Sequence, residues 1–243
     1  MKKNKQKALL KFEKKFSKNT KIKPTKKEIN KSIKSLDPKI KNAIDFAYSR
    51  ILKFHSLQKN KNIKYVDKQN NKIEYKYIPI QSVGIYVPSN LPSTLLMNAI
   101  LAKKIAGVKR VVLANPRLNG KLNPAVMYAA KKCGISEIIS VGGSQAIASL
   151  AYIQKVNKIV GPGNDYVARA KKEVFGDVGI EGIAGPSEIT VVADKNTNLK
   201  EVLTSLIGQA EHDTNSQCIL IVNNQDFIKS LKKVLKQELN KIP

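Results

Sequence analysis

Apolar residues recur at every third or fourth position over residues 26–58, which is the spacing of an amphipathic helix. Asp37 and Pro38 interrupt this run at a point where a new helix would begin, so the pattern predicts two helices. Residues 61–82 tend instead to alternate between apolar and polar side chains. That alternation predicts a β-hairpin whose turn lies around residues 68–71.

From Val83 onward, short runs of β-branched residues alternate with helical segments, a pattern typical of α/β proteins. The predicted strands cover residues 83–87, 110–114, 137–141, 158–160, 189–193 and 217–222. The predicted helices cover residues 93–106, 124–133, 144–151, 164–175, 199–211 and 226–239. Such regular alternation favours a mostly parallel sheet that binds its ligands at the carboxyl ends of its strands.

The charge balance raises the question of nucleic-acid binding and then argues against it. The 243 residues carry a formal net charge of +26, and residues 1–76 account for +18 of it, so the excess is mostly N-terminal. Only four of the 44 basic residues are arginine, which is the better bidentate reader of phosphate and guanine. We therefore favour a solvated lysine-rich surface, or one that attracts an acidic partner, over a basic nucleic-acid-binding protein.

Neither the apolar stretches nor the cysteines indicate a membrane or secreted protein. The longest apolar stretches fall far below the roughly 18 to 20 residues that cross a bilayer, so no membrane partner is expected and the predicted compartment is the cytoplasm. Cys133 and Cys218 are too few for a disulfide framework, and both are predicted to be buried small residues. His55, beside Phe54 on a predicted helix, is interpreted as a packing or surface residue and not as a ligand.

Three short segments lie where the predicted sheet would present a site. Residues 84–88 (GIYVP) end a strand with Tyr86, which can stack on a planar ring or donate a hydrogen bond. Residues 141–146 (VGGSQA) and 160–164 (VGPGN) each lead from a strand through glycines into a helix, and free N–H groups at a helix N-terminus favour anions. Neither segment matches G-x-G-x-x-G, so each glycine turn taken singly is better explained by a structural role than by ligand binding.

A fourth segment, residues 184–188 (AGPSE), is followed by residues 209–212 (QAEH). Residues three apart on a helix share a face, so Gln209 and His212 could converge on one metal ion. Histidine is a common zinc ligand and a glutamine oxygen is an unusual one. A metal site would need further ligands, so on the pattern alone metal binding is the less favoured interpretation of this segment.

Taken in order and with their spacing, these segments resemble the histidinol dehydrogenase family, and looser similarity reaches back to about residue 25. The resemblance implies oxidation of L-histidinol through L-histidinal to L-histidine in histidine biosynthesis, with two molecules of NAD reduced in succession. It further implies a homodimer and one zinc ion per subunit. By the same resemblance Tyr86, Gln145 and Asn164 contact NAD, Ser187 contacts the substrate, and Gln209 and His212 bind both zinc and substrate.

The family pattern also has parts without a counterpart in these residues. In the family a Glu-His pair acts as general base, and an aspartate and a further histidine complete the zinc shell. Residues after His212 include no histidine, so no catalytic residue is assigned and only two zinc ligands are present. The chain is accordingly expected to be an N-terminal part of the enzyme and inactive alone; the alternative is a non-catalytic or split-enzyme half that binds a nucleotide.

The resemblance also implies a division into domains. The expected fold is α/β, with a Rossmann-like parallel-sheet unit inserted into a second, incomplete α/β domain. Residues 1–24 carry none of this similarity, and their lysine-rich composition predicts a loosely held arm or a short helix that docks elsewhere. Residues 25–85 would form the first part of domain 1. Residues 86–188 would form the Rossmann-like NAD-binding domain. Residues 189–243 would return to domain 1 and begin the zinc and substrate site.

Overall fold

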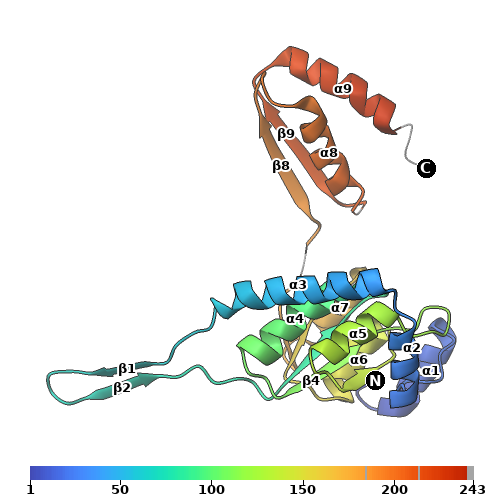
Figure 1. Ribbon diagram of the computed structural model, residues 1–243, viewed down its shortest axis with the longest axis vertical. Helices are drawn as coiled ribbons and strands as arrows, with labels where there is room; N and C mark the ends of the chain where they lie inside the picture. Colours follow the sequence, from blue (N-terminus) through green and yellow to red (C-terminus); the bar gives the residue numbers. More distant parts are fainter. Residues whose placement is uncertain (184, 213, 240–243) are drawn as a thin grey trace. The chain divides into compact units, whose positions relative to one another are not determined.

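The computed structural model describes residues 1–183, 185–212 and 214–239 (Figure 1), which group into two compact units divided after Ile183. Each unit has its own sheet and its own apolar core. The mixed α/β architecture predicted from the sequence is confirmed. The predicted division into domains stays a prediction. The two units are defined only by contacts within this chain, and such contacts do not test the predicted domain bounds.

The first unit is built on a five-stranded, all-parallel sheet with the strand order β5-β4-β3-β6-β7. Its strands are β3 (Ser82–Tyr86), β4 (Arg110–Ala114), β5 (Glu137–Ile139), β6 (Lys158–Val160) and β7 (Gly179–Ile180). The chain first adds β4 and β5 on one side of β3 and then adds β6 and β7 on the other. The strand order therefore reverses between β3 and β6, the position where open parallel sheets bind ligands.

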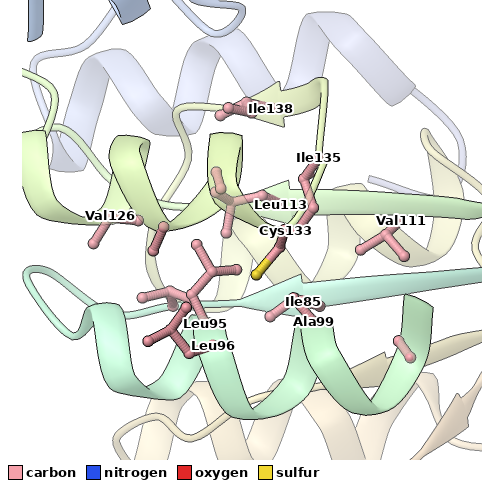
Figure 2. Close-up of a cluster of buried hydrophobic side chains, with 14 of the residues drawn as sticks. Ile85, Leu95, Leu96, Ala99, Val111, Leu113, Val126, Cys133, Ile135 and Ile138 are labelled. Carbon is pink, nitrogen blue, oxygen red and sulfur yellow. The ribbon is translucent and has the colours of Figure 1, made fainter. Parts of the chain in front are cut away.

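Helices cover both faces of this sheet. One face packs against α4 (Pro92–Ala99), η1 (Ile100–Ile105) and α5 (Pro124–Lys132), with α2 (Lys26–Lys34) and α3 (Pro38–Ser56) packed outside them. The other face packs against α6 (Gly143–Tyr152) and α7 (Asp165–Val174), which α1 (Lys5–Phe16) adjoins. Figure 2 shows the first core, in which Ile85 and Leu113 of the strands meet Leu95, Leu96 and Val126 of the helices.

The helix predicted over residues 93–106 is α-helical only as far as Ala99 and continues as the π-helix η1. The Ala106 N–H donates to the carbonyl of Leu101, five residues back. Such wider turns insert one residue into a helix and are not visible in apolar spacing. Here Ile100 and Ala102 are both buried, although they lie only two positions apart.

The predicted hairpin is present as β1 (Ile63–Val66) and β2 (Lys72–Tyr75), which pair antiparallel from Ile63 opposite Tyr75 to Val66 opposite Lys72. The Asp67 carboxylate closes the turn, because its Oδ1 accepts from the N–H groups of Gln69 and Asn71, each at 2.8 Å. Both strands are exposed, and the hairpin projects away from the five-stranded sheet (Figure 1).

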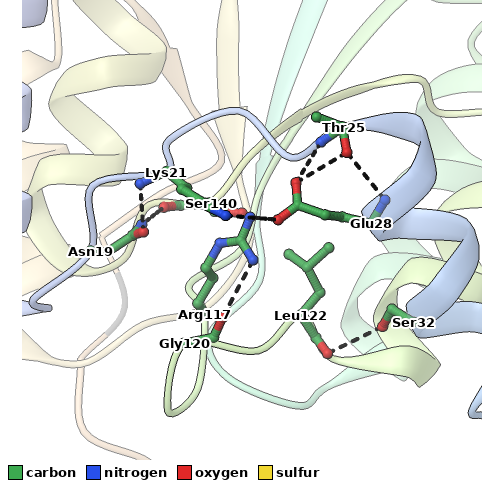
Figure 3. A network of polar contacts seen from close by, with 9 residues as sticks. All are labelled: Asn19, Lys21, Thr25, Glu28, Ser32, Arg117, Gly120, Leu122 and Ser140. Carbon is green, nitrogen blue, oxygen red and sulfur yellow. Dashed lines mark hydrogen bonds and ion pairs between the residues drawn. The ribbon is translucent and has the colours of Figure 1, made fainter.

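The N-terminal residues form a docked helix, the second of the two forms expected for them. In α1, Leu9 and Glu13 lie four residues apart and are each only 1% exposed. The segment after α1 is held by side chains too: Asn19 Nδ2 donates to the Ser140 carbonyl at 2.7 Å, and Arg117 contacts Glu28 at 3.3 Å (Figure 3). The Thr25 N–H is the largest cause that lowers the pKa of Glu28, and Arg117 adds to it.

The second unit pairs β8 (Glu188–Ala193) with β9 (Gln217–Val222) in parallel, beside α8 (Leu199–Ala210) and α9 (Gln225–Leu239). Its buried core is small and consists of Ala193, Val202, Phe227 and Leu231. The prediction that Cys218 is buried is wrong: the Sγ of Cys218 donates to the Leu206 carbonyl at 3.2 Å, but the residue is exposed. It lies at the start of β9, and the buried core does not extend there.

The two remaining side-chain predictions are confirmed. Cys133 is buried, as predicted, in the core of the first unit. His55 is 9% exposed, packs edge-to-face against Phe54 and shares a 2.6 Å hydrogen bond between its Nδ1 and Gln58 Oε1. Among the described residues, none of the helices has the length and apolar character needed to cross a membrane.

Candidate cofactor site

The candidate site lies at the carboxyl ends of β3 and β6, where the strand order reverses. Tyr86 ends β3, and the turn of residues 161–164 leads from β6 into α7. The turn approaches β3 very closely, since a Cβ on Gly161 would lie 2.0 Å from the Tyr86 carbonyl oxygen. Gly161 also has a φ of +115°, which side-chain-bearing residues rarely adopt. Glycine at this position therefore brings two of the predicted NAD contacts, Tyr86 and Asn164, toward one edge of the sheet.

Tyr86 is 4% exposed and its ring packs into the core on the α6 side of the sheet. Its hydroxyl oxygen accepts a hydrogen bond from the Gly143 N–H at 3.1 Å. Burial raises the pKa of Tyr86, so the hydroxyl keeps its proton and can donate it to a further acceptor. The burial leaves little ring surface for stacking, and the hydrogen bond joins β3 to the start of α6.

The N-terminus of α6 faces a carboxylate of the same chain. Glu13 of α1 is buried, and the Gly142 N–H at the start of α6 lies beside its carboxyl group. Burial is the largest effect and raises the pKa of Glu13, whereas the Gly142 N–H opposes that rise. The helix end that the sequence predicts as an anion cradle therefore directs its first N–H groups at Glu13 and Tyr86.

This arrangement predicts an unusual pH dependence of stability. A carboxyl whose pKa is raised on folding adds stability below its unfolded pKa and loses it as the pH rises through the folded pKa. We expect Glu13→Gln, which keeps an oxygen for the Gly142 N–H, to raise the free energy of unfolding at pH 8 by about 1 kcal/mol. Urea unfolding from pH 4 to pH 8 measures this, with the exposed Glu173→Gln as control. A variant less stable than the parent at every pH would contradict it.

Asn164 has a structural task that must be separated from any contact with a cofactor. It is the N-cap of α7, and its Oδ1 accepts from the Val167 N–H at 3.2 Å. An asparagine cap stabilises a helix because it satisfies an amide that has no partner within the helix.

We expect Asn164→Ala to lower the free energy of unfolding by about 1 kcal/mol and Asn164→Asp to leave it nearly unchanged, because aspartate caps equally well. Thermal unfolding of both variants checks this difference. If Asn164 also contacts NAD, both variants bind NAD more weakly than the parent, including the stable aspartate variant. If the alanine variant were as stable as the parent, Asn164 would not stabilise α7 as its N-cap.

Gln145, the third predicted NAD contact, lies in the first turn of α6 and lines a groove of about 550 Å³ between α1, α6 and α7. Its Oε1 accepts a hydrogen bond from the Ser144 hydroxyl at 3.1 Å. Tyr166 of α7 gives the same groove an exposed ring, and Arg169 gives it a cation that is paired at 2.8 Å with Glu173, another residue of the groove. A dinucleotide offers a planar base and phosphates, so these wall chemistries fit one.

The other three predicted residues belong to the second unit, and Ala184 of their motif lies outside the described residues. Ser187 is exposed, and its carbonyl accepts from the Gln217 N–H at 3.1 Å. The α8 helix ends at Ala210, so half-buried Gln209 is in its last turn and exposed His212 follows in a turn. Within the part of the chain that the structure describes, no three His, Cys, Asp or Glu residues are grouped to hold a metal.

Sequence reasoning missed the charged residues that support the site. Lys171 and Glu13 are each nearly fully buried on helices, in rows that are otherwise apolar: Val167, Lys171 and Val174 on α7, and Leu9 with Glu13 on α1. A charged residue at an inward-facing position of a helix is a signal in the sequence that could have identified both side chains. Asn115, fully buried after β4, gave no comparable signal.

Comparison with known proteins matches the whole chain to one family. The profile of the histidinol dehydrogenase family covers residues 1–243. A histidinol dehydrogenase of Pelagibacter ubique is 59% identical, over 100% of this chain and 58% of the relative. Histidinol dehydrogenase 1 of Trichormus variabilis is 46% identical, over 84% of this chain and 49% of the relative. The chain thus spans between 49% and 58% of the length of these relatives.

Solved structures give the same result at the level of the fold. The crystal structure of histidinol dehydrogenase from Elizabethkingia anophelis matches 100% of this chain and 58% of its own, with a TM-score of 0.90 and 36% identity. An acetylating aldehyde dehydrogenase from Geobacillus thermoglucosidasius matches 96% of this chain with a TM-score of 0.52 and 17% identity. The second likeness concerns the fold alone.

Proposed function

The chain belongs to the histidinol dehydrogenase family, and from this premise we propose that it serves the oxidation of L-histidinol through L-histidinal to L-histidine. Each oxidation removes a hydride from the substrate carbon and releases a proton, and water adds to the aldehyde between the two. NAD, when bound, accepts one hydride in each oxidation. The observation that carries the proposal is the convergence of Tyr86 and the 161–164 turn where the strand order reverses.

We assign the chain's own residues to holding and orienting the reactants. Gln145 and Asn164 would hydrogen-bond the cofactor at the N-terminal ends of α6 and α7. Ser187, Gln209 and His212 of the second unit would bind the substrate, and the latter two supply an oxygen and a nitrogen donor that zinc accepts. Zinc, when bound, would anchor and orient the substrate.

We do not assign proton transfer to any residue of this chain. The family's Glu-His base pair and its two further zinc ligands have no counterpart among residues 213–243, which include no histidine. We propose that they come from the portion of the relatives' length that the 243 residues do not span. A homodimer and a cytoplasmic location also belong to this proposal.

The test is NAD binding by the 243-residue chain, measured by titration calorimetry. We expect Gln145→Ala to weaken binding about tenfold, the equivalent of about 1.4 kcal/mol. Gln154→Ala is the matched control, because Gln154 lies just beyond the opposite end of the same helix. An unaltered parent chain that gives no heat with NAD at millimolar concentration would overturn the cofactor assignment. Equal losses in both variants would overturn the role of Gln145.

A further inference from the structure

An ion pair between the buried Lys171 and the partly exposed Glu181 holds both backbone groups of Gly161. Glu181 Oε1 accepts from the Gly161 N–H at 2.9 Å, and Lys171 Nζ donates to the Gly161 carbonyl at 2.5 Å. The two side chains also contact each other, with 2.6 Å between Lys171 Nζ and Glu181 Oε1. A single residue at the carboxyl end of β6 is therefore clamped from both sides by opposite charges.

The position of Lys171 indicates that stability alone does not explain the clamp. Its side chain is only 7% exposed and stands in the row of α7 that also holds Val167 and Val174, where a methionine or leucine would pack. An ion pair with a buried member loses much of its attraction to lost hydration, so replacing both partners with apolar residues is often at least as stable. What the pair provides, and an apolar residue does not, is directional hydrogen bonding to Gly161.

The clamped residue is the one on which the site geometry depends. Gly161 lies against the backbone of Tyr86, and the turn that it begins ends at Asn164, the N-cap of α7. A shift of this turn would displace Asn164 and the start of α7 together. Glu181 follows β7, the edge strand beside β6, so the clamp also fixes the turn to a neighbouring strand.

We propose that Lys171 and Glu181 are positioning residues for the cofactor: their ion pair fixes the Gly161 peptide and thereby the 161–164 turn on which NAD binds. The inference rests on the proposed function for its ligand. Neither side chain is assigned a contact with NAD, so both act through the backbone that they hold.

The test compares three variants of the 243-residue chain with the parent in two measurements. Titration calorimetry gives the NAD affinity, and hydrogen exchange of the Gly161 amide, followed by NMR, reports the clamp without any ligand. We expect Lys171→Met and Glu181→Gln each to weaken NAD binding about tenfold and to speed exchange at Gly161. Lys171→Arg, which keeps the positive charge, should bind NAD more tightly than Lys171→Met and nearly as tightly as the parent. Glu137→Gln, which breaks the Arg110–Glu137 pair between β4 and β5, is the control and should bind NAD normally.

Distinct outcomes separate the two proposals. The double variant Lys171→Met/Glu181→Gln should bind NAD no more weakly than the worse single variant, because both remove one clamp. Faster exchange at Gly161 with NAD affinity unchanged in both single variants would overturn the positioning role. A parent chain that fails to bind NAD would overturn the proposed function and with it the cofactor role, while exchange still shows whether the pair holds the turn. If Lys171→Met does not fold, Glu181→Gln decides the question, because it keeps the shape of the partly exposed Glu181 side chain.

Discussion

Gly161→Ala is expected to lower the free energy of unfolding of the first unit by about 3 kcal/mol and to abolish measurable NAD binding. Two costs add: a side-chain-bearing residue at a φ of +115° is strained by roughly 1 to 2 kcal/mol, and overpacking adds roughly 1 to 3 kcal/mol. The contact that causes the overpacking is with a backbone atom, the Tyr86 carbonyl oxygen, which no rotamer change can relieve. Urea unfolding followed by circular dichroism measures the loss.

Gly176→Ala separates these two costs. Gly176 has a φ of +100°, but a Cβ there meets no atom within 4 Å, so only the backbone strain applies. We expect a loss of about 1 kcal/mol and unchanged NAD binding. Equal destabilisation by the two alanines would mean that the close approach of the turn to β3 carries no cost.

Asn115→Asp is expected to destabilise the first unit by about 3 kcal/mol at pH 7, although the two side chains have nearly the same shape. Asn115 is fully buried, and its Nδ2 donates to the carbonyls of Val87 and Ser89, each at 2.9 Å. An ionised aspartate donates nothing and would face both carbonyl oxygens with a buried charge. Chemical unfolding at fixed pH measures the loss.

The sign of the pH dependence gives a second check on Asn115→Asp. Burial would raise the folded pKa of the new carboxyl, so the lost stability should return in part as the pH falls toward the unfolded value, about 3.9. Asn98→Asp is the control, because half-buried Asn98 donates only within its own helix, to the Thr94 carbonyl at 2.9 Å. A loss that is the same at pH 4 and pH 7 would show that the carboxyl is not buried.

Much of the fold could be predicted because its strands are short runs of apolar, mostly β-branched residues. The strands Arg110–Ala114, Lys158–Val160 and Gln217–Val222 begin and end where the sequence predicts. The strand Gly179–Ile180 is different: it has only two residues, and a glycine and an isoleucine carry no periodicity. It is defined by its pairing with β6, which is a long-range contact that local pattern does not contain.

The candidate site was predictable in its glycines and not in its charges. Gly161 stands out in the sequence because a strand followed by Gly-Pro-Gly predicts a tight turn. Lys171 and Glu181 interact with that turn from ten and twenty positions away along the chain, so only the folded structure brings them to Gly161. Glu13 is more distant still, because α1 precedes the sheet by some 70 residues and reaches α6 only through tertiary packing.

The docked α1 helix bears on how the protein should be tagged or labelled. Met1 and Lys2 line the same groove as Gln145, at the end where Lys2 pairs with Asp177 and lies over the Tyr152 ring, so an affinity tag fused at the amino terminus would crowd that groove. The turn of the β1–β2 hairpin, residues 67–71, is exposed on a projecting arm and joins strands that bury none of their residues (Figure 1). A short epitope or a dye inserted there should leave the groove open.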